Sequence, residues 1–282
     1  MQPILIGGLR RNFRIEGAPV GSPFEGLRAQ PHFLSKAPRD EMITLECLGN
    51  IWTMSLPNGA SVSGDLDWLA ADIDARLLRD AVAQEREAVV ISGSTVVTPD
   101  GKRLVLLARR GAMKTAAIVE LLGSGWRVEG NALIFVRRDG FTAYPQAIRI
   151  DAEASRLIDL SIDVHLSRPV ESFDGRWHAL SPDAFGQRWI IEEAPASAIL
   201  FLDLNPGGSI SDIKRIPSQK AFATALNAVT IKPSAAALSS LMRQISVCPA
   251  YQIRSRDSHA LKTAFMCVAD LIGNETRNPS SL

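Results

Sequence analysis

The stretch from Leu104 to Val136 constrains the fold more than any other part of this chain. Its pattern predicts a buried strand at 104–107, a turn with one glycine and one lysine, an amphipathic helix at about 114–122 and a second apolar strand at 132–136. A strand that leads through a Gly/Lys turn into a helix is typical of phosphate-binding loops. In such loops the free backbone N–H groups and the positive end of the helix dipole point at one anion. The stretch therefore predicts an α/β fold built around a phosphate loop.

The loop departs from the full phosphate-binding motif G-x-x-x-x-G-K-[ST] at both glycines. When Lys114 and Thr115 fill the last two places of the motif, Ala108 and Met113 stand where the glycines belong. A side chain before the lysine resists the close approach or the backbone angle that glycine permits, at a cost of roughly 1–3 kcal/mol. The sequence thus predicts a phosphate loop in an altered form.

Composition bounds the class of protein. The chain has 282 residues, of which 46% are hydrophobic and 22% charged, and its net charge is +1, as is ordinary for a globular protein. No apolar run approaches the roughly 20 residues that a membrane-spanning helix needs, and the N-terminus lacks the pattern of a secretory signal. We therefore expect a cytoplasmic protein that does not associate with a membrane.

The cysteines and histidines do not form a recognisable metal motif. Cys47, Cys248 and Cys267 are odd in number, far apart and flanked by apolar residues, which favours free thiols over disulfides. The four histidines share no ligand spacing. We therefore expect no metal site built from Cys and His.

The first part of the chain predicts two regions that precede the main domain. Residues 1–40 are rich in Gly, Pro and Arg and have little periodicity, so they predict an irregular N-terminal arm. Residues 41–87 predict a small α+β region packed on the main domain. It would contain two strands separated by Gly49-Asn50, a turn at Pro57-Asn58-Gly59 and a helix from about 65 to 84.

The C-terminal part predicts helices and a short tail. Apolar residues recur with helical spacing through 220–231 and 235–247, and residues 273–282 predict a flexible tail. From residue 209 onward, nine Lys or Arg residues stand against four Asp or Glu residues. These dispersed charges favour acidic partners mildly and argue against a nucleic-acid interface.

From residue 88 the order of elements resembles a known family. The segment SGSTVVTPDGKRLVLLARRGAMKTAAIVELLGSGWRVEGNA resembles the C-terminal domain of bacterial HPr serine kinase/phosphorylase and of HPr-kinase-related proteins, whose fold is similar to that of phosphoenolpyruvate carboxykinase. The resemblance continues through 145–149, the strand at 198–204 and the helical end of the chain, and it spans about 88–272. It implies an α/β domain with a mixed sheet, ATP and Mg²⁺ as cofactors, a protein or peptide partner, and a homo-oligomer.

Some residues of the loop match the family. By this resemblance Gly111 keeps the inner glycine, Lys114 keeps the lysine that contacts phosphate, and Thr115 keeps the hydroxyl that would hold Mg²⁺. Arg109 and Arg110 add two cations to the loop, and they either hold a phosphate, a phosphopeptide or an acidic partner, or lie solvated at the loop tip.

Other positions depart from the family pattern. Gly93 stands where the family has a histidine, and Asn131 and Ala132 stand where it has an acidic pair. In the family those carboxylates are expected to bind the metal and accept the proton of the attacking hydroxyl, which an amide and a methyl group cannot do. Strand alternation predicts that Glu129 shares a face with Asn131, so Glu129 is the candidate catalytic carboxylate.

The family also has basic residues that face the phosphates in the segment after its second hairpin. By resemblance, Arg149 and Arg168 are the candidates for these anion contacts. Two functions then remain open. The first is a catalytically degenerate relative, a pseudokinase that serves as a binding or regulatory module and could retain weak nucleotide or phosphate binding. The alternative is an active ATP-dependent serine kinase that uses Lys114, Thr115 and Glu129.

Overall fold

The computed structural model describes residues 3–7, 11–26, 39–85, 87–108, 112–144, 146, 148–158, 169–172, 175–180, 185, 187, 192–204 and 212–277. The chain divides into two compact units, and each is formed by two separate segments. The first unit comprises Met1–Glu85 and Tyr144–Ile191, and the second comprises Arg86–Ala143 and Glu192–Leu282. The sequence-based boundary at 87/88 lies close to the first junction. Residues 144–191 belong with the first unit, although the sequence assigns them to the larger domain.

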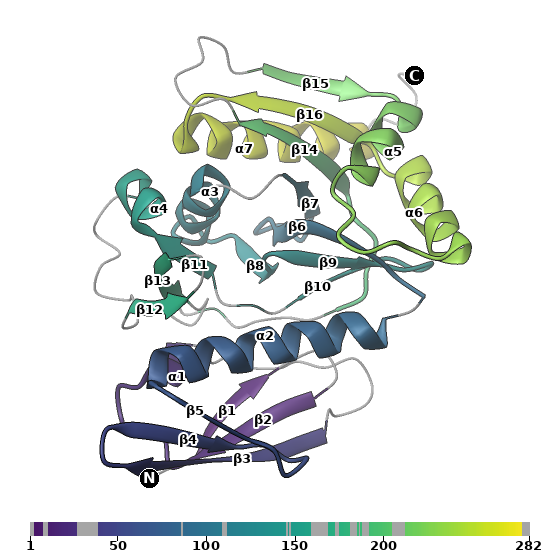
Figure 1. Cartoon of the computed structure of the whole chain (residues 1–282). Coiled ribbons are helices and arrows are strands. Elements are labelled where there is room, and N and C mark those ends of the chain that lie inside the picture. The colour runs from purple at the N-terminus through teal and green to yellow at the C-terminus, as the bar shows by residue number, and fades with distance from the viewer. Residues whose placement is uncertain are drawn as a thin grey trace. The chain divides into compact units, whose positions relative to one another are not determined.

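A five-stranded sheet forms one layer of the first unit (Figure 1). The sequence predicts an irregular arm at 1–40, whereas the structure has two strands, a short helix and the start of a third strand in this region. Isoleucine and phenylalanine alternate with polar residues there over only a few positions, and the surrounding glycines and arginines hide this pattern. The sheet order is β1 (Ile4–Gly7), β2 (Arg11–Glu16), β3 (Arg39–Leu48), β4 (Ile51–Ser55) and β5 (Ser61–Gly64).

Helix α2 (Leu66–Gln84) is the longest element of the first unit. Its N-cap is Asp65, whose side chain accepts a hydrogen bond from the backbone N–H of Trp68 at 2.7 Å. The helix contacts β12, a strand of a second, three-stranded sheet in the same unit. The remaining elements in the described part of this unit are α1 (Pro23–Gly26), β11 (Ile148–Asp151), α4 (Ala152–Leu157), β12 (Pro169–Ser172) and β13 (Gly175–Leu180).

The second unit is built on a mixed eight-stranded sheet. Three neighbouring strands, β7, β14 and β16, are parallel, and the strands on either side of them run antiparallel. The run that precedes Pro99 forms one continuous strand of nine residues, β6. The strands are β6 (Val89–Val97), β7 (Arg103–Leu107), β8 (Arg127–Gly130), β9 (Leu133–Val136), β10 (Phe141–Ala143), β14 (Ala198–Leu204), β15 (Asp212–Ile216) and β16 (Ala250–Ser255).

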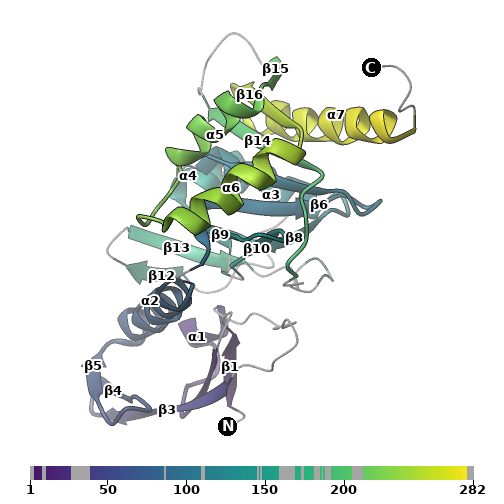
Figure 2. The same ribbon diagram turned by 90° about the vertical axis from the view of Figure 1, so that its right-hand side faces the viewer.

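Helices cover the two faces of this sheet (Figure 2). One face packs on α5 (Ser218–Leu226) and α6 (Ala235–Val247), whose buried alanines and aliphatic residues join Val89, Ile91 and Val105 in one core. The opposite face packs on α3 (Ala112–Leu122), which also contacts α7 (Ser258–Arg277). The prediction of a mixed α/β protein with a small N-terminal α+β region and a helical C-terminal part is confirmed. Among the described helices, none is both long and apolar enough to cross a membrane.

Candidate functional site

The predicted phosphate loop connects β7 to α3. The strand ends at Leu107 and the helix begins at Ala112, so the strand and the helix predicted from the sequence are present. Three predicted contacts in the loop, Arg109, Arg110 and Gly111, lie outside the described residues. The site can therefore be followed from the residues that flank them.

Lys114 is buried in the second unit and forms a hydrogen bond with a strand of the sheet. Its side chain projects from the first turn of α3, and its Nζ donates to the hydroxyl of Ser94 on β6 at 3.1 Å. The same hydroxyl donates to Oδ1 of Asn131 at 2.6 Å. Only 5% of Lys114 is exposed. The ammonium group is thus the first member of an internal polar chain that ends on the amide of Asn131.

Burial shapes the electrostatics of Lys114. Loss of hydration lowers the pKa of Lys114 from 10.5 to about 8, because a charged amine is disfavoured away from water. No carboxylate pairs with Lys114 among the described residues, so only the hydrogen bond to Ser94 offsets part of this cost. Its neighbours Met113 and Thr115 are also buried, in the first turn of the same helix.

Gly93, at the position of the family's histidine, has no room for a side chain. A Cβ atom at this position would lie 2.7 Å from the backbone oxygen of Leu106 and 2.8 Å from Cδ1 of Ile134. The first of these contacts is with backbone on the neighbouring strand β7, which cannot move aside without disturbing the sheet. A histidine does not fit at position 93 in this packing.

Glu129 forms an ion pair with a buried arginine. Its Oε1 accepts a hydrogen bond from the guanidinium of Arg103 at 2.7 Å, and both side chains are more than nine-tenths buried. Burial raises the pKa of Glu129 to about 7, although the charge and hydrogen bond of Arg103 oppose the shift. Arg103 also donates to the backbone oxygens of Phe141 and Glu192. Glu129 therefore belongs to a structural cluster around Arg103.

Glu129 and Asn131 lie on opposite faces of the sheet, which differs from the prediction. Asn131 bonds to Ser94, whereas Glu129 bonds to Arg103, which is paired with Val97 on β6. Paired residues share a face and successive residues alternate, so Ser94 and Arg103 are on different faces.

A β-bulge explains this difference. On β8, Val128 pairs with Val96 and Gly130 pairs with Thr95, which leaves Glu129 as an extra residue between them. Such a bulge interrupts alternation and redirects the side chain. Glu129 consequently lies on the α5 and α6 face, and Lys114 lies on the α3 face.

Ala132, the second position of the family's acidic pair, has an unusual backbone. Its φ angle is +72°, in the left-handed region that residues with a Cβ rarely adopt. Its carbonyl accepts a hydrogen bond from the N–H of Gly93 at 3.0 Å. This contact ties the connection between β8 and β9 to β6.

Arg149, another predicted anion contact, forms its ion pair elsewhere. Arg149 belongs to the first unit, where its guanidinium forms an ion pair with Asp74. Asp74 also accepts a hydrogen bond from Nε2 of Gln146 at 2.7 Å. Arg168 lies outside the described residues. The structure therefore brings Lys114 together with Ser94 and Asn131, and it places Arg149 in a separate ion pair.

The described side chains do not fit the ATP and Mg²⁺ that the resemblance implies. The ammonium of Lys114 bonds inward, Met113 occupies the glycine position, and Asn131 is already an acceptor for Ser94. Among the described residues, no group of three or more His, Cys, Asp or Glu side chains is arranged to hold a metal ion. Lys114, the predicted phosphate contact, is part of the interior.

Sequence reasoning missed Ser94 and Arg103, the two partners that define this site. Ser94 lies in the middle of β6 and Arg103 begins β7, and both strands are almost entirely buried. A polar side chain in such a run must find a hydrogen-bond partner, and this was the available signal. The identity of the partner could not be read from it.

Comparisons with known proteins do not extend this picture. A scan of the sequence against protein-family models finds no match, and a search of curated proteins finds no similar sequence. Arguments about function therefore start from the residues of this chain.

Proposed function

We propose that this chain is a catalytically degenerate HPr-kinase-like protein, a pseudokinase that acts as a binding or regulatory module for a protein or peptide partner. The order of strand, loop and helix around Lys114 supports the kinase-like ancestry. The mixed sheet with helices on both faces is compatible with a PEP-carboxykinase-like fold.

The position of Glu129 carries this proposal. An active kinase of this type needs a carboxylate close to the transferred phosphate, to accept the proton of the attacking hydroxyl. Glu129 is the substitute that the sequence offers, but it is ion-paired with Arg103 on the face of the sheet opposite to Lys114. Asn131, which shares the face of Lys114, cannot accept this proton.

The burial of Lys114 supports the same conclusion. To contact a phosphate, the lysine would have to leave its hydrogen bond with Ser94 and turn outward from the interior. The side chain of Met113 also occupies the position where a working loop has glycine.

Nucleotide binding and turnover test the proposal. We expect ATP with Mg²⁺ to leave the melting temperature of the protein unchanged and to be hydrolysed no faster than in buffer, because a ligand stabilises a protein only when it binds the folded state. A matched variant restores the family residues by Met113→Gly, Asn131→Asp and Ala132→Asp. If this variant binds ATP and the unmodified protein does not, the result would support the proposal that these three positions once formed a nucleotide site.

A different result would support the active-kinase alternative. If ATP with Mg²⁺ raises the melting temperature by several degrees and Lys114→Ala abolishes this shift, the site still binds nucleotide. If phosphate transfer is also observed and disappears in Glu129→Gln, the pseudokinase proposal is wrong.

A further inference from the structure

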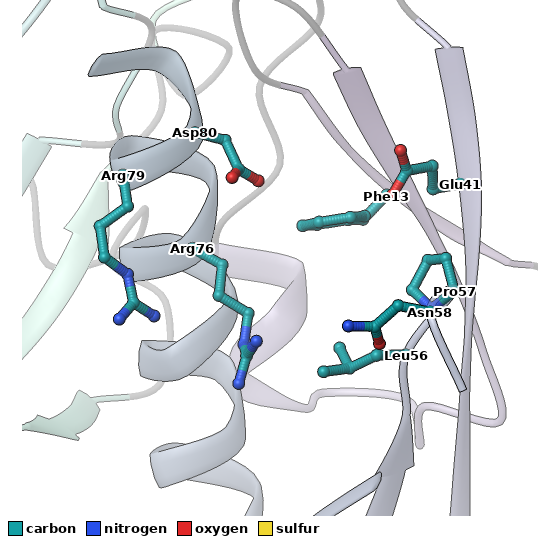
Figure 3. Close-up of a pocket in the computed structure, with 8 residues that line it drawn as sticks. All are labelled: Phe13, Glu41, Leu56, Pro57, Asn58, Arg76, Arg79 and Asp80. Atoms are coloured by element: carbon teal, nitrogen blue, oxygen red, sulfur yellow. The ribbon is translucent and has the colours of Figure 1, made fainter. Parts of the chain in front are cut away.

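A second candidate site lies in the first unit, in a cavity between α2 and the five-stranded sheet (Figure 3). Its volume is about 420 Å³, within the range typical of small-molecule sites. One wall is formed by charged side chains of α2, and the other by residues of β2, β3 and the β4–β5 turn. All lining residues belong to the first unit.

One end of the cavity presents hydrogen-bond donors. Arg76 is fixed by its neighbour on α2, because its Nε donates to Asp72 at 2.6 Å. Neither terminal nitrogen of Arg76 donates a hydrogen bond to the described part of the chain. Figure 3 shows this guanidinium directed toward Asn58 and Leu56 across the cavity. A fixed guanidinium with open terminal donors is suited to a carboxylate.

Asn58 adds a second donor at the same end. Its Oδ1 accepts a hydrogen bond from the backbone N–H of Ala60 at 3.2 Å. Because a backbone N–H can only donate, this contact fixes which side of the amide carries oxygen. The NH₂ group is consequently the part of Asn58 that points into the cavity (Figure 3).

The other end of the cavity presents acceptors, and the middle is apolar. Asp80 and Glu41 contribute one carboxylate each, and Asp80 points toward the ring of Phe13 (Figure 3). Phe13 supplies apolar surface between the two ends, and Leu56 supplies apolar surface beside Asn58 (Figure 3). The cavity is therefore dipolar, with cationic donors at one end and anionic acceptors at the other.

We propose that this cavity binds a zwitterion of the amino-acid or short-peptide class, with its carboxylate at Arg76 and Asn58 and its ammonium group at Asp80 and Glu41. The apolar part of the ligand lies against Phe13 and Leu56. The lining charges pair with the two ends of such a ligand, whereas a plain anion would meet the carboxylates and a plain cation would meet Arg76. This inference does not depend on the proposed function, because no residue around Lys114 contributes to it.

Calorimetric titration of the full-length chain tests the proposal. The probes are L-leucine and the dipeptide leucyl-leucine, each titrated to about 10 mM so that millimolar dissociation constants are detected. Two analogues serve as controls: leucinamide, which lacks the carboxylate, and 4-methylpentanoate, which lacks the ammonium group. We expect saturable binding of at least one zwitterion, and binding at least tenfold weaker for both analogues. Comparison of leucine with leucyl-leucine distinguishes a free amino acid from a peptide.

Variants then assign the two ends of the cavity. Arg76→Gln and Asp80→Asn should each weaken binding of the zwitterion at least tenfold, whereas Arg256→Gln, an exposed arginine of the second unit, should leave it unchanged. Circular dichroism checks that the variants fold, and the analogue series tests the proposal without any variant. The proposal is overturned if neither zwitterion binds saturably, if the analogues bind as tightly as the zwitterions, or if folded Arg76→Gln and Asp80→Asn bind normally.

Discussion

At the scale of single residues, burial decides the properties of Lys114, which the sequence predicts to be a phosphate contact. A lysine in a working loop is held at the surface by the anion it binds. Here its partners are Ser94 and, through it, Asn131, and it is only 5% exposed. The charge of Lys114 consequently reduces stability, since one neutral hydroxyl does not replace the hydration that is lost.

The variant Lys114→Met tests this account through its pH dependence. At pH 7 we expect the variant to be more stable than the unmodified protein by roughly 1–3 kcal/mol, because the cost of burying the charge is removed. The pKa of Lys114 is about 8 in the folded protein and 10.5 without the protein environment. Between these values the unfolded chain binds more protons than the folded one, so the stability of the unmodified protein rises with pH and the advantage of the variant shrinks.

Urea unfolding at pH 7 and at about pH 9.5 measures this difference. The exposed residue Lys232 provides a matched control, because Lys232→Met should have the same small effect at both pH values. A variant Lys114→Met that is less stable than the unmodified protein at both pH values would show that the hydrogen bond to Ser94 outweighs the cost of burial.

Glu129 and Arg103 are expected to act as a unit. Removing one partner of a buried ion pair leaves the other charge uncompensated, at a cost of about 3–5 kcal/mol, and Glu129→Ala should show a loss of this size. In the double variant Glu129→Ala with Arg103→Met, the loss should be smaller than the sum of the two single losses. Chemical denaturation of the four proteins measures the coupling, and simple additivity would mean that the ion pair contributes nothing.

At the scale of elements, the bulge on β8 and the turn that follows it decide which side chains meet. The β8 register shifts at Glu129, and Ala132 then adopts a φ of +72° before β9 begins. Both features lie next to β6, to which Ala132 is joined by the hydrogen bond from Gly93. Asn131 and Ala132 thus form part of a chain reversal between two strands.

Glycine at position 132 should relieve the backbone. Because a left-handed φ disfavours alanine and suits glycine, we expect Ala132→Gly to raise the free energy of unfolding by about 0.5–1 kcal/mol. Ala143→Gly, in the strand β10, is the matched control and should lower it, since glycine is unfavourable in a strand. Urea unfolding of both variants measures the two effects. Equal destabilisation by both would mean that the turn does not favour glycine.

At the scale of the whole molecule, the chain leaves the second unit after Ala143 and re-enters it at Glu192. The segment between them, 144–191, belongs to the first unit. The two ends of the interruption are held together within the second unit. Phe141 and Ala194 exchange backbone hydrogen bonds of 2.9 and 3.3 Å, and the guanidinium of Arg103 donates to the carbonyl oxygens of Phe141, Glu192 and Ala194. The second unit is therefore closed at the point where the chain leaves and re-enters it.

This closure predicts that the second unit folds without the first. We expect residues 86–282 to fold when 144–191 are replaced by a linker of about four Gly and Ser residues, the length of an ordinary hairpin loop. Circular dichroism should then show helix and strand content and one cooperative thermal transition. A broad, non-cooperative melt would mean that the second unit needs the first.

The sequence by itself determined the features that depend on neighbouring residues. The apolar spacing of α2, α3 and α6, the turns at Gly49-Asn50 and Pro57-Asn58-Gly59, and the strand before Lys114 were all predictable, because propensity and periodicity act over a few residues. The mixed α/β class followed from the order of these elements.

Only the tertiary structure decided the character of the candidate sites. Ser94 and Asn131 are 37 residues apart and Arg103 and Glu129 are 26 apart, and local patterns contain no information about such pairs. Strand alternation predicted one face for Glu129 and Asn131, but the bulge opposite Thr95 and Val96 placed them on two. Contacts between distant segments likewise decide that 144–191 belongs to the first unit. They also form the cavity beside Arg76. The sequence therefore determined where the loop lies, whereas packing of the sheet against α3 determined that its lysine is buried.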